Sequence, residues 1–189
     1  MQITDNLKND ISDAPSWFHD AINIKPSEKI LKDAKGNLSY SVWPSLSENK
    51  NLMIFIHGTG AHKKWWYPIA PQFVNYSNVI AVDLPGMGDS GFREKYSIKD
   101  FGQCIISIIE NEKSNMNIDN ISIIGHSLGG QVAGYVASEE KNLVSNLIMI
   151  DTFIRPPDWD PSQNEGGPLR MIKYYPDKTT ILNLSLIHI

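Results

Sequence analysis

Four short, almost uninterrupted apolar stretches constrain the fold of this chain more than any other feature. They read Leu-Met-Ile-Phe-Ile at 52–56, Val-Ile-Ala-Val at 79–82, Ile-Ser-Ile-Ile at 121–124 and Leu-Ile-Met-Ile at 147–150. Continuous rather than alternating apolarity is typical of strands covered on both faces, as in a parallel sheet. Segments with helical character, over 98–112 and 128–140, lie between the later stretches. The alternation predicts an α/β fold with a mostly parallel sheet and helices on both of its faces.

The segments on either side of this pattern have a different character. A short amphipathic entry is expected around 15–18, followed by two strands near 29–33 and 37–43 with a hairpin turn at Lys35-Gly36-Asn37. After Asp151, residues 152–183 contain five prolines and a Gly-Gly pair, which indicates an irregular or helical excursion from the sheet. We expect 1–152 to form a core and 153–183 to begin a cap.

Composition bounds the class of protein. The 189 residues, 41% apolar and 20% charged, suit one globular domain. The net charge of −4 comes from scattered acids, so no nucleic-acid partner is expected. Neither a signal peptide nor a membrane-length apolar stretch is recognisable, and the single Cys104 sits in an apolar run as a buried hydrophobe. These features predict a cytoplasmic protein without a membrane partner, and they leave the oligomeric state open.

The most specific chemical signal is Gly-His-Ser-Leu-Gly at 125–129, between a predicted strand and a predicted helix. A G-x-S-x-G motif in that context is a nucleophile elbow, in which the serine sits on a tight, strained turn. Glycines two residues away on each side avoid a collision. Ser127 is therefore the candidate nucleophile, and the Leu128 N–H at the helix N-terminus is a candidate donor to an oxyanion. The alternative is a glycine-rich turn whose serine only caps the helix.

A second glycine-rich segment, His57-Gly58-Thr59-Gly60, follows the strand at 52–56. Glycines allow the backbone to approach a substrate oxygen closely, so the Thr59 N–H is the candidate second oxyanion donor. His57 precedes the nucleophile and is interpreted as ordering the loop rather than as the catalytic base. Trp65 and Trp66 suit core packing and substrate contact equally well.

These segments together resemble the α/β-hydrolase superfamily over about residues 15–152. The resemblance rests on H-G-x-G with a tryptophan shortly after it, on Asp83-Leu84-Pro85-Gly86-Met87-Gly88-Asp89-Ser90 as the D-x-x-G-x-G-x-S turn, and on the elbow, in the family's order. It implies an α/β-hydrolase fold and an acyl-transfer chemistry that needs no cofactor. Gly86-Met87-Gly88-Asp89-Ser90-Gly91 also fits a dinucleotide fingerprint, but that motif must open a helix directly, and polar 92–97 follows instead.

The resemblance also implies an acid and then a histidine after the nucleophile, and this chain offers little for either. Asp151, at the end of the sixth predicted strand, is a possible acid, and the later histidine, His188, has no strand context. The last six residues, 184–189, match the translation of a sequencing-library transposon end, CTG TCT CTT ATA CAC ATC. We therefore expect a C-terminally truncated fragment that lacks its last strands. The alternative is a genuine apolar terminal strand.

Two functions of different classes follow. The first is a serine hydrolase that acts on a small ester or related acyl substrate through an acyl-enzyme at Ser127, with this fragment inactive by itself. The second is a non-catalytic protein that binds a small ligand on the same fold. Within the fold, carbon–carbon bond hydrolases, acyltransferases and cofactor-free haloperoxidases stay open. Truncation would also leave the 147–150 strand as an unpaired apolar edge and make the protein prone to association.

Overall fold

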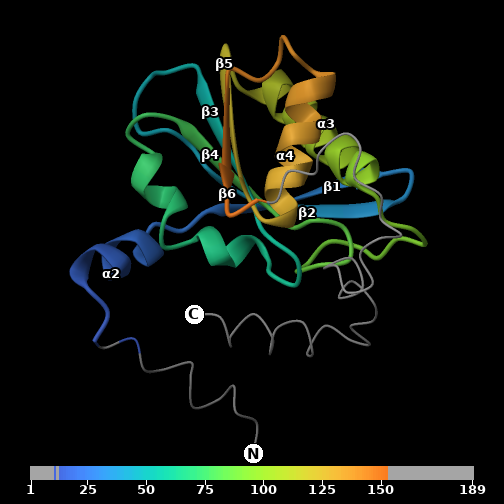
Figure 1. The fold of residues 1–189 in the computed structure, drawn as a ribbon. Coiled ribbons are helices and arrows are strands. Elements are labelled where there is room, and N and C mark those ends of the chain that lie inside the picture. Colours follow the sequence, from blue (N-terminus) through green and yellow to red (C-terminus); the bar gives the residue numbers. More distant parts are fainter. Residues whose placement is uncertain (1–10, 12, 153–189) are drawn as a thin grey trace, which may run out of the picture.

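The fold was analysed in a computed structural model, which describes residue 11 and residues 13–152. Its elements follow the sequence as α2 Ser16–Asn23, β1 Ser27–Asp33, β2 Gly36–Trp43, β3 Asn51–Ile56, η1 Lys63–Trp66, η2 Ala70–Phe73, β4 Asn78–Val82, α3 Ile98–Asn115, β5 Asn120–His126, α4 Leu128–Glu139 and β6 Asn146–Ile150. All four continuous apolar stretches are strands, and both predicted helical segments are helices (Figure 1). The expected cap at 153–183 and the suspected scar at 184–189 lie outside the described residues.

The six strands form one sheet in the order β1-β2-β4-β3-β5-β6. Strands β3 to β6 run parallel to one another, whereas β2 pairs antiparallel with both β1 and β4. The carboxyl ends of β3, β4 and β5 therefore meet at one edge of the sheet. In an open α/β sheet this edge is where ligands bind.

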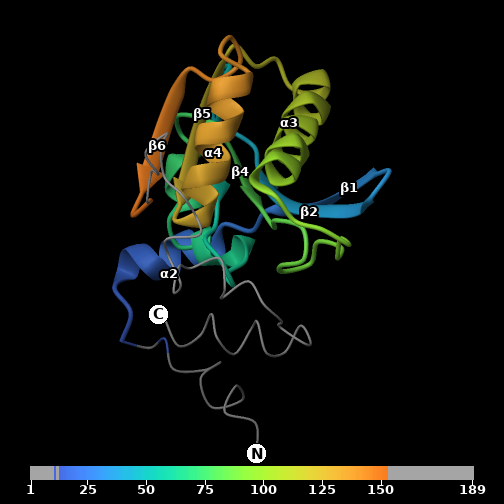
Figure 2. The same cartoon turned by 45° about the vertical axis from the view of Figure 1, so that its right-hand side comes forward.

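Each central strand buries both of its faces, which explains the continuous apolar pattern. On β3, Leu52, Ile54 and Ile56 face a core built with α3 and α4, whereas Phe55 faces a second core with Trp66 of η1. Figure 2 shows α3 and α4 together on one side of the sheet and α2 low on the opposite side. Helices on both faces were predicted, and among the described residues the second face carries α2 together with the short 3-10 turns η1 and η2.

The β1–β2 hairpin was predicted, but its turn lies one residue earlier than expected. Asp33 pairs with Gly36, so Ala34 and Lys35 form a two-residue loop and Gly36 already belongs to β2. Gly36 has a φ of 133°, which a residue with a side chain rarely adopts. The backbone conformation thus places the glycine at the start of the strand rather than at the centre of the turn.

Strand β6 has one neighbour, β5, among the described residues, and it exposes apolar side chains. Ile148 is 46% exposed and Leu147 40% exposed. An apolar strand edge with free hydrogen-bonding groups promotes pairing with another chain. We expect the 189-residue chain to associate with increasing concentration in size-exclusion chromatography, and Ile148→Lys to shift the elution toward monomer. A chain that stays monomeric and unfolds cooperatively would contradict this expectation.

Within the described residues, no helix is both long enough and apolar enough to cross a membrane. The apolar run around Cys104 belongs to α3, and the Cys104 side chain is buried at 7% exposure in the core that α3 shares with α4. This placement agrees with its interpretation as a small buried hydrophobe.

Candidate active site

Ser127 lies at the junction of β5 and α4, where the sequence predicts a nucleophile elbow. Its backbone has a φ of 51° and a ψ of −115°, a conformation that is strained for a residue with a side chain. The Ser127 N–H donates to the carbonyl oxygen of Ile150 at 3.0 Å, and its side chain does not cap the helix. The geometry therefore does not show the alternative, a serine that only caps the helix, and Ser127 itself is half-buried.

Two glycines make this turn possible. A Cβ on Gly125 would overlap the carbonyl oxygen of Gly129, and a Cβ on Gly129 would overlap the carbonyl oxygens of Ile56 and His57. These neighbours are backbone atoms, which cannot rotate out of the way as a flexible side chain could. The spacing of the two glycines in the motif thus follows from close approach of the backbone on both sides of Ser127.

The first turn of α4 supplies a candidate oxyanion donor. Leu128 is the first residue of the helix, so its backbone N–H belongs to the group that has no acceptor within the helix. The helix dipole adds positive potential at this end. A negatively charged oxygen bound to Ser127 would therefore be stabilised here.

The loop that follows β3 comes close to the elbow. A Cβ placed on Gly58 would lie 3.3 Å from the Ser127 Cβ and 2.8 Å from His126 Nδ1, so a larger residue would press on both. Thr59, the next residue, is exposed beside this contact. The structure thus places both sequence-predicted oxyanion segments, the one at Leu128 and the one at Thr59, next to Ser127.

His57 is fully buried, and both of its ring nitrogens are engaged. Nδ1 lies 2.7 Å from the carbonyl oxygen of Gly58, and Nε2 accepts a hydrogen bond from the Leu84 N–H at 3.1 Å. Neither nitrogen is free to take a proton from Ser127. His57 instead ties the loop after β3 to the loop after β4. Burial lowers the pKa of His57 to about 4, although the nearby Asp83 carboxylate opposes the effect.

This buried histidine makes stability depend on pH. An unfolded histidine titrates near pH 6.5, so between about pH 6.5 and 4 the unfolded chain binds more protons than the folded chain. We expect His57 to lower the free energy of unfolding as pH falls through this window, by up to about 3 kcal/mol, and to have no effect above it. Urea unfolding at pH 7.5, 6 and 5 measures the slope. An equal slope in His57→Gln would assign the pH dependence to other groups.

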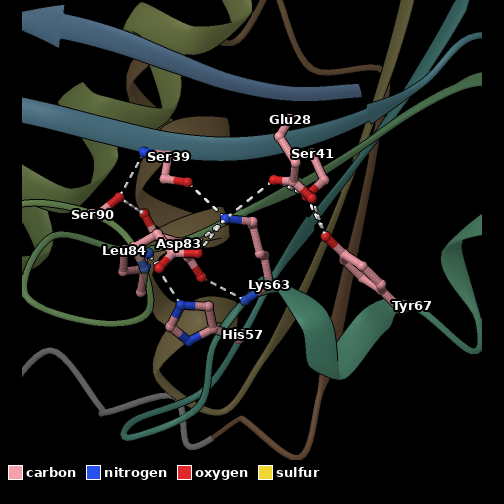
Figure 3. Close-up of polar contacts among 10 residues, drawn as sticks. Glu28, Ser39, Ser41, His57, Lys63, Tyr67, Asp83, Leu84 and Ser90 are labelled. Atoms are coloured by element: carbon pink, nitrogen blue, oxygen red, sulfur yellow. Dashed lines mark hydrogen bonds and ion pairs between the residues drawn. The ribbon is translucent and has the colours of Figure 1, made fainter. Parts of the chain in front are cut away.

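A buried ion cluster beneath the same loops was missed by the sequence analysis. The Lys63 ammonium, 2% exposed, lies 3.0 Å from Asp83 Oδ2 and donates to Ser39 Oγ at 2.7 Å (Figure 3). The partly exposed carboxylates of Asp89 and Glu28 lie 3.2 and 3.3 Å away. Burial lowers the pKa of Lys63, but the carboxylates, led by Asp83, outweigh it and the pKa is raised.

The cluster joins three segments that are distant in sequence. Asp83 accepts the Lys63 N–H at 2.7 Å and the Asp89 N–H at 2.8 Å. Ser90 Oγ donates to the Asp83 carbonyl oxygen and accepts the Ser39 N–H, both within 2.8 Å. The D-x-x-G-x-G-x-S turn is thereby fixed to β2 and to the start of η1. Lys63, six residues after His57, was the available signal, because a buried acid such as Asp83 requires a cation.

The aromatic residues and the turn motif have separable roles. Trp66 packs in the core against Phe55, with ring centroids 5.1 Å apart, whereas Trp65 contacts the His126 ring at 4.6 Å beside the elbow. Trp66 therefore packs in the core, and Trp65 lies beside the elbow.

The Gly-x-Gly-x-x-Gly match opens no helix, since α3 begins at Ile98. This agrees with the rejection of the dinucleotide fingerprint.

The acid and the base are the incomplete part of the site. Asp151 is exposed, has a φ of 46° and directly follows Ile150, whose carbonyl oxygen accepts the Ser127 N–H. Burial lowers the pKa of His126, and the charge of Asp151 opposes this. The described histidines, at 19, 57, 62 and 126, all precede Ser127, and His188 lies outside the described residues. The described part of the chain thus holds a candidate nucleophile and two candidate oxyanion donors, with one acid nearby.

An open, mostly parallel sheet with a serine elbow at its carboxyl edge defines the α/β-hydrolase class. The family model for the alpha/beta hydrolase fold matches residues 51–188, and the chain belongs to this family. It is 31% identical over 128 residues to a pimeloyl-[acyl-carrier protein] methyl ester esterase of Pseudoalteromonas atlantica, covering 64% of this chain and 46% of the esterase. It is 30% identical over 104 residues to a soluble epoxide hydrolase of a Corynebacterium species, covering 52% and 34%.

Solved structures show the same fold. A thioesterase domain from the curacin biosynthetic pathway has a TM-score of 0.63 at 22% identity and covers 80% of this chain and 53% of that domain. A hydrolase from Pseudomonas aeruginosa has a TM-score of 0.60 at 19% identity and covers 69% and 48%. The chain spans less than half the length of the esterase and of the epoxide hydrolase.

Proposed function

We propose that the protein containing this chain is a serine hydrolase that acts on an ester or related acyl substrate through an acyl-enzyme at Ser127. The observation that carries the proposal is the strained backbone of Ser127 (φ 51°) between a parallel strand and a helix N-terminus. Strain of this kind persists where function requires it, since a capping serine needs none. The esterase relative adds support for acyl chemistry, and a serine in the elbow argues against nucleophilic attack by an aspartate.

The chemistry follows from the groups around Ser127. Its Oγ attacks the substrate carbonyl carbon while a base takes the hydroxyl proton, and the carbonyl oxygen becomes an oxyanion that accepts from the N–H groups of Leu128 and Thr59. The alcohol leaves with a proton, which produces the acyl-enzyme. Water then attacks the acyl carbon, Ser127 regains its proton, and the carboxylic acid is released. The base is a histidine beyond the described residues, and Asp151 is a candidate to orient it.

Hydrolysis of p-nitrophenyl butyrate, measured on the 189-residue chain and on the complete reading frame of the source locus, tests the proposal. We expect turnover from the complete protein, and Ser127→Ala to lower kcat about a thousandfold or more. Ser138→Ala, an exposed serine in the same helix, is the matched control and should not change the rate.

Full activity in Ser127→Ala would refute the assignment of the nucleophile. A reading frame with no histidine able to reach Ser127 would remove the base and favour the second function, a small-ligand-binding protein on the same scaffold. Labelling of Ser127 by a fluorophosphonate, located by peptide mass, separates a reactive serine from an inert one in either chain.

A further inference from the structure

A cavity of about 210 Å³ lies on the side of the sheet that carries α3, separate from the elbow. Three segments line it and leave it partly open to solvent: the β1–β2 turn, the stretch from 85 to 96 and the first half of α3. Figure 2 shows the β1–β2 hairpin and α3 on the same side of the molecule, away from β6. The volume is several times the share of about 30 Å³ that one water occupies, so the cavity has room for a small organic molecule.

The wall of the cavity contains a buried arginine that is only partly paired. The Arg93 side chain is 6% exposed, and its Nη2 contacts Asp33 Oδ2 at 3.0 Å. Its Nη1 is buried and has no hydrogen-bond partner among the described residues. A buried donor without an acceptor is destabilising, and more so when it is charged. The arrangement therefore favours an incoming acceptor, above all an anionic one.

The charges around the cavity leave an excess of one positive charge. Arg93, Lys35 and Lys95 are cationic, whereas Asp33 and Asp100 are anionic. Asp33 pairs with Arg93, and Asp100 with Lys35 at 2.8 Å on the exposed rim. The unbalanced charge is that of Lys95, an exposed lysine of the lining, and a ligand with a single negative charge would neutralise it, whereas a dianion would not.

The rest of the lining is largely apolar. Pro85, Phe101 and the Tyr96 ring contribute to it, together with Cys104. Burial, reinforced by Asp33, raises the pKa of the Cys104 thiol, although the adjacent Arg93 guanidinium opposes the effect, so this side chain stays a neutral thiol and is not a nucleophile. An inorganic anion would leave these surfaces uncovered. The lining suits a molecule with a charged head and a short apolar body.

We infer that this cavity is a binding site for a small monocarboxylate with a short hydrocarbon chain, whose carboxylate pairs with Arg93. The site does not depend on Ser127 or on the proposed hydrolase activity. Nη1 rests against Gly36, so the guanidinium must shift slightly to share a ligand oxygen. The Tyr96 hydroxyl accepts the Arg93 N–H at 2.9 Å and holds that segment while the side chain moves.

Titration of the 189-residue chain with hexanoate, followed by backbone amide NMR, tests the inference. We expect saturable binding with a Kd of about 1 mM, in line with the modest affinity of a ligand of this size. The largest shift changes should fall at Lys35, Gly36 and Cys104. Hexanamide, which has the same chain without the charge, should bind at least tenfold more weakly.

Two variants test the charge of Arg93 and the volume of the cavity separately. Arg93→Met keeps the side-chain length and should weaken hexanoate binding at least tenfold, whereas Lys99→Met, an exposed lysine of α3 that does not line the cavity, should not. Ser107→Trp fills the cavity from α3, leaves Arg93 intact and should also remove binding. It guards against the possibility that Arg93→Met perturbs the fold.

Several results would overturn the inference. They are the absence of saturable binding up to 50-fold above the expected Kd, equal binding of hexanamide, and unchanged binding in Ser107→Trp. Shift changes centred on Gly58, Thr59 and Leu128 would also overturn it, because they would place the carboxylate at the elbow, where it would act as a reaction product. Loss of Ser127 activity would leave the inference unaffected, so the two proposals fail separately.

Discussion

Replacing Lys63 by methionine is expected to lower the free energy of unfolding by about 3–5 kcal/mol, because it leaves a buried carboxylate without its cation. Asp83 is 1% exposed on its side chain and lies 3.0 Å from the ammonium that would be lost. Methionine is close in length, so the effect comes from charge and not from a cavity. Urea unfolding at pH 7.5 measures the loss. The neighbouring Lys64 is exposed, so Lys64→Met should change stability by less than about 0.5 kcal/mol.

A double variant distinguishes the missing cation from other damage. In Lys63→Met/Asp83→Asn an uncharged amide replaces the carboxylate. Part of the lost stability should therefore return, and the effects of the two substitutions on the free energy of unfolding should be strongly non-additive. Strictly additive changes in the free energy of unfolding, or a loss below about 1 kcal/mol in Lys63→Met, would contradict this expectation. They would mean that water solvates the Asp83 carboxylate in the variant, or that the carboxylate rotates toward solvent. The Lys63 ion pair would then be dispensable for holding the loops after β3 and β4 together.

The fold could be predicted from the sequence because its signals are local. Continuous apolar runs identified β3, β4, β5 and β6, since burial on both faces removes the alternation that a half-exposed strand shows. The turn of the β1–β2 hairpin was predicted one residue late, because the choice between neighbouring registers depends on the φ that Gly36 adopts. The 3-10 turns η1 and η2 were not foreseen, since a short turn has no periodic pattern.

The site was predictable to the extent that it lies in backbone geometry. Ser127 and the segments at Leu128 and Thr59 follow from glycine spacing after strands, which fixes backbone approach whatever the neighbouring side chains do. The Lys63–Asp83 pair and the half-paired Arg93 were not predictable in this way. Their partners are 20 and 60 residues away in sequence, and such contacts are decided by side-chain packing. The catalytic roles of Ser127, Leu128 and Thr59 stay predictions, and so does that of Asp151, which needs a histidine outside the described residues.

The loops at the carboxyl edge of the sheet work as one unit. His57 bonds to the Leu84 N–H, Lys63 bonds to Asp83, and Gly58 lies against Ser127. The polar contacts are buried, so each would leave an unpaired group if the loops separated. The candidate oxyanion segment is therefore held by the turn after β4 as well as by its own strand. A strained serine keeps its conformation only in such a setting, where its neighbours restrict the alternatives.

Gly129 is the residue at which this unit meets α4, and its replacement by alanine is expected to cost about 3 kcal/mol or more of unfolding free energy. The added Cβ would overlap the carbonyl oxygens of Ile56 and His57, so the helix or the end of β3 must move. Either movement also shifts the Leu128 N–H away from the oxyanion position. Urea unfolding of the variant measures the loss, and the amide shifts of Thr59 and Leu128 report the displacement.

Gly134 provides the matched control within the same helix. A Cβ there would meet Met149 Cε at 3.5 Å, an ordinary contact, so Gly134→Ala should stabilise the protein by about 0.5–1 kcal/mol through helix propensity. The two glycines are five residues apart in one helix. Changes of opposite sign in the free energy of unfolding would show that close backbone approach, and not helix propensity, requires a glycine at 129. If both substitutions were stabilising, α4 would have room above β3. The tight turn at Ser127 would then not depend on a glycine two residues later, and the physical explanation of the second glycine in the motif would be removed.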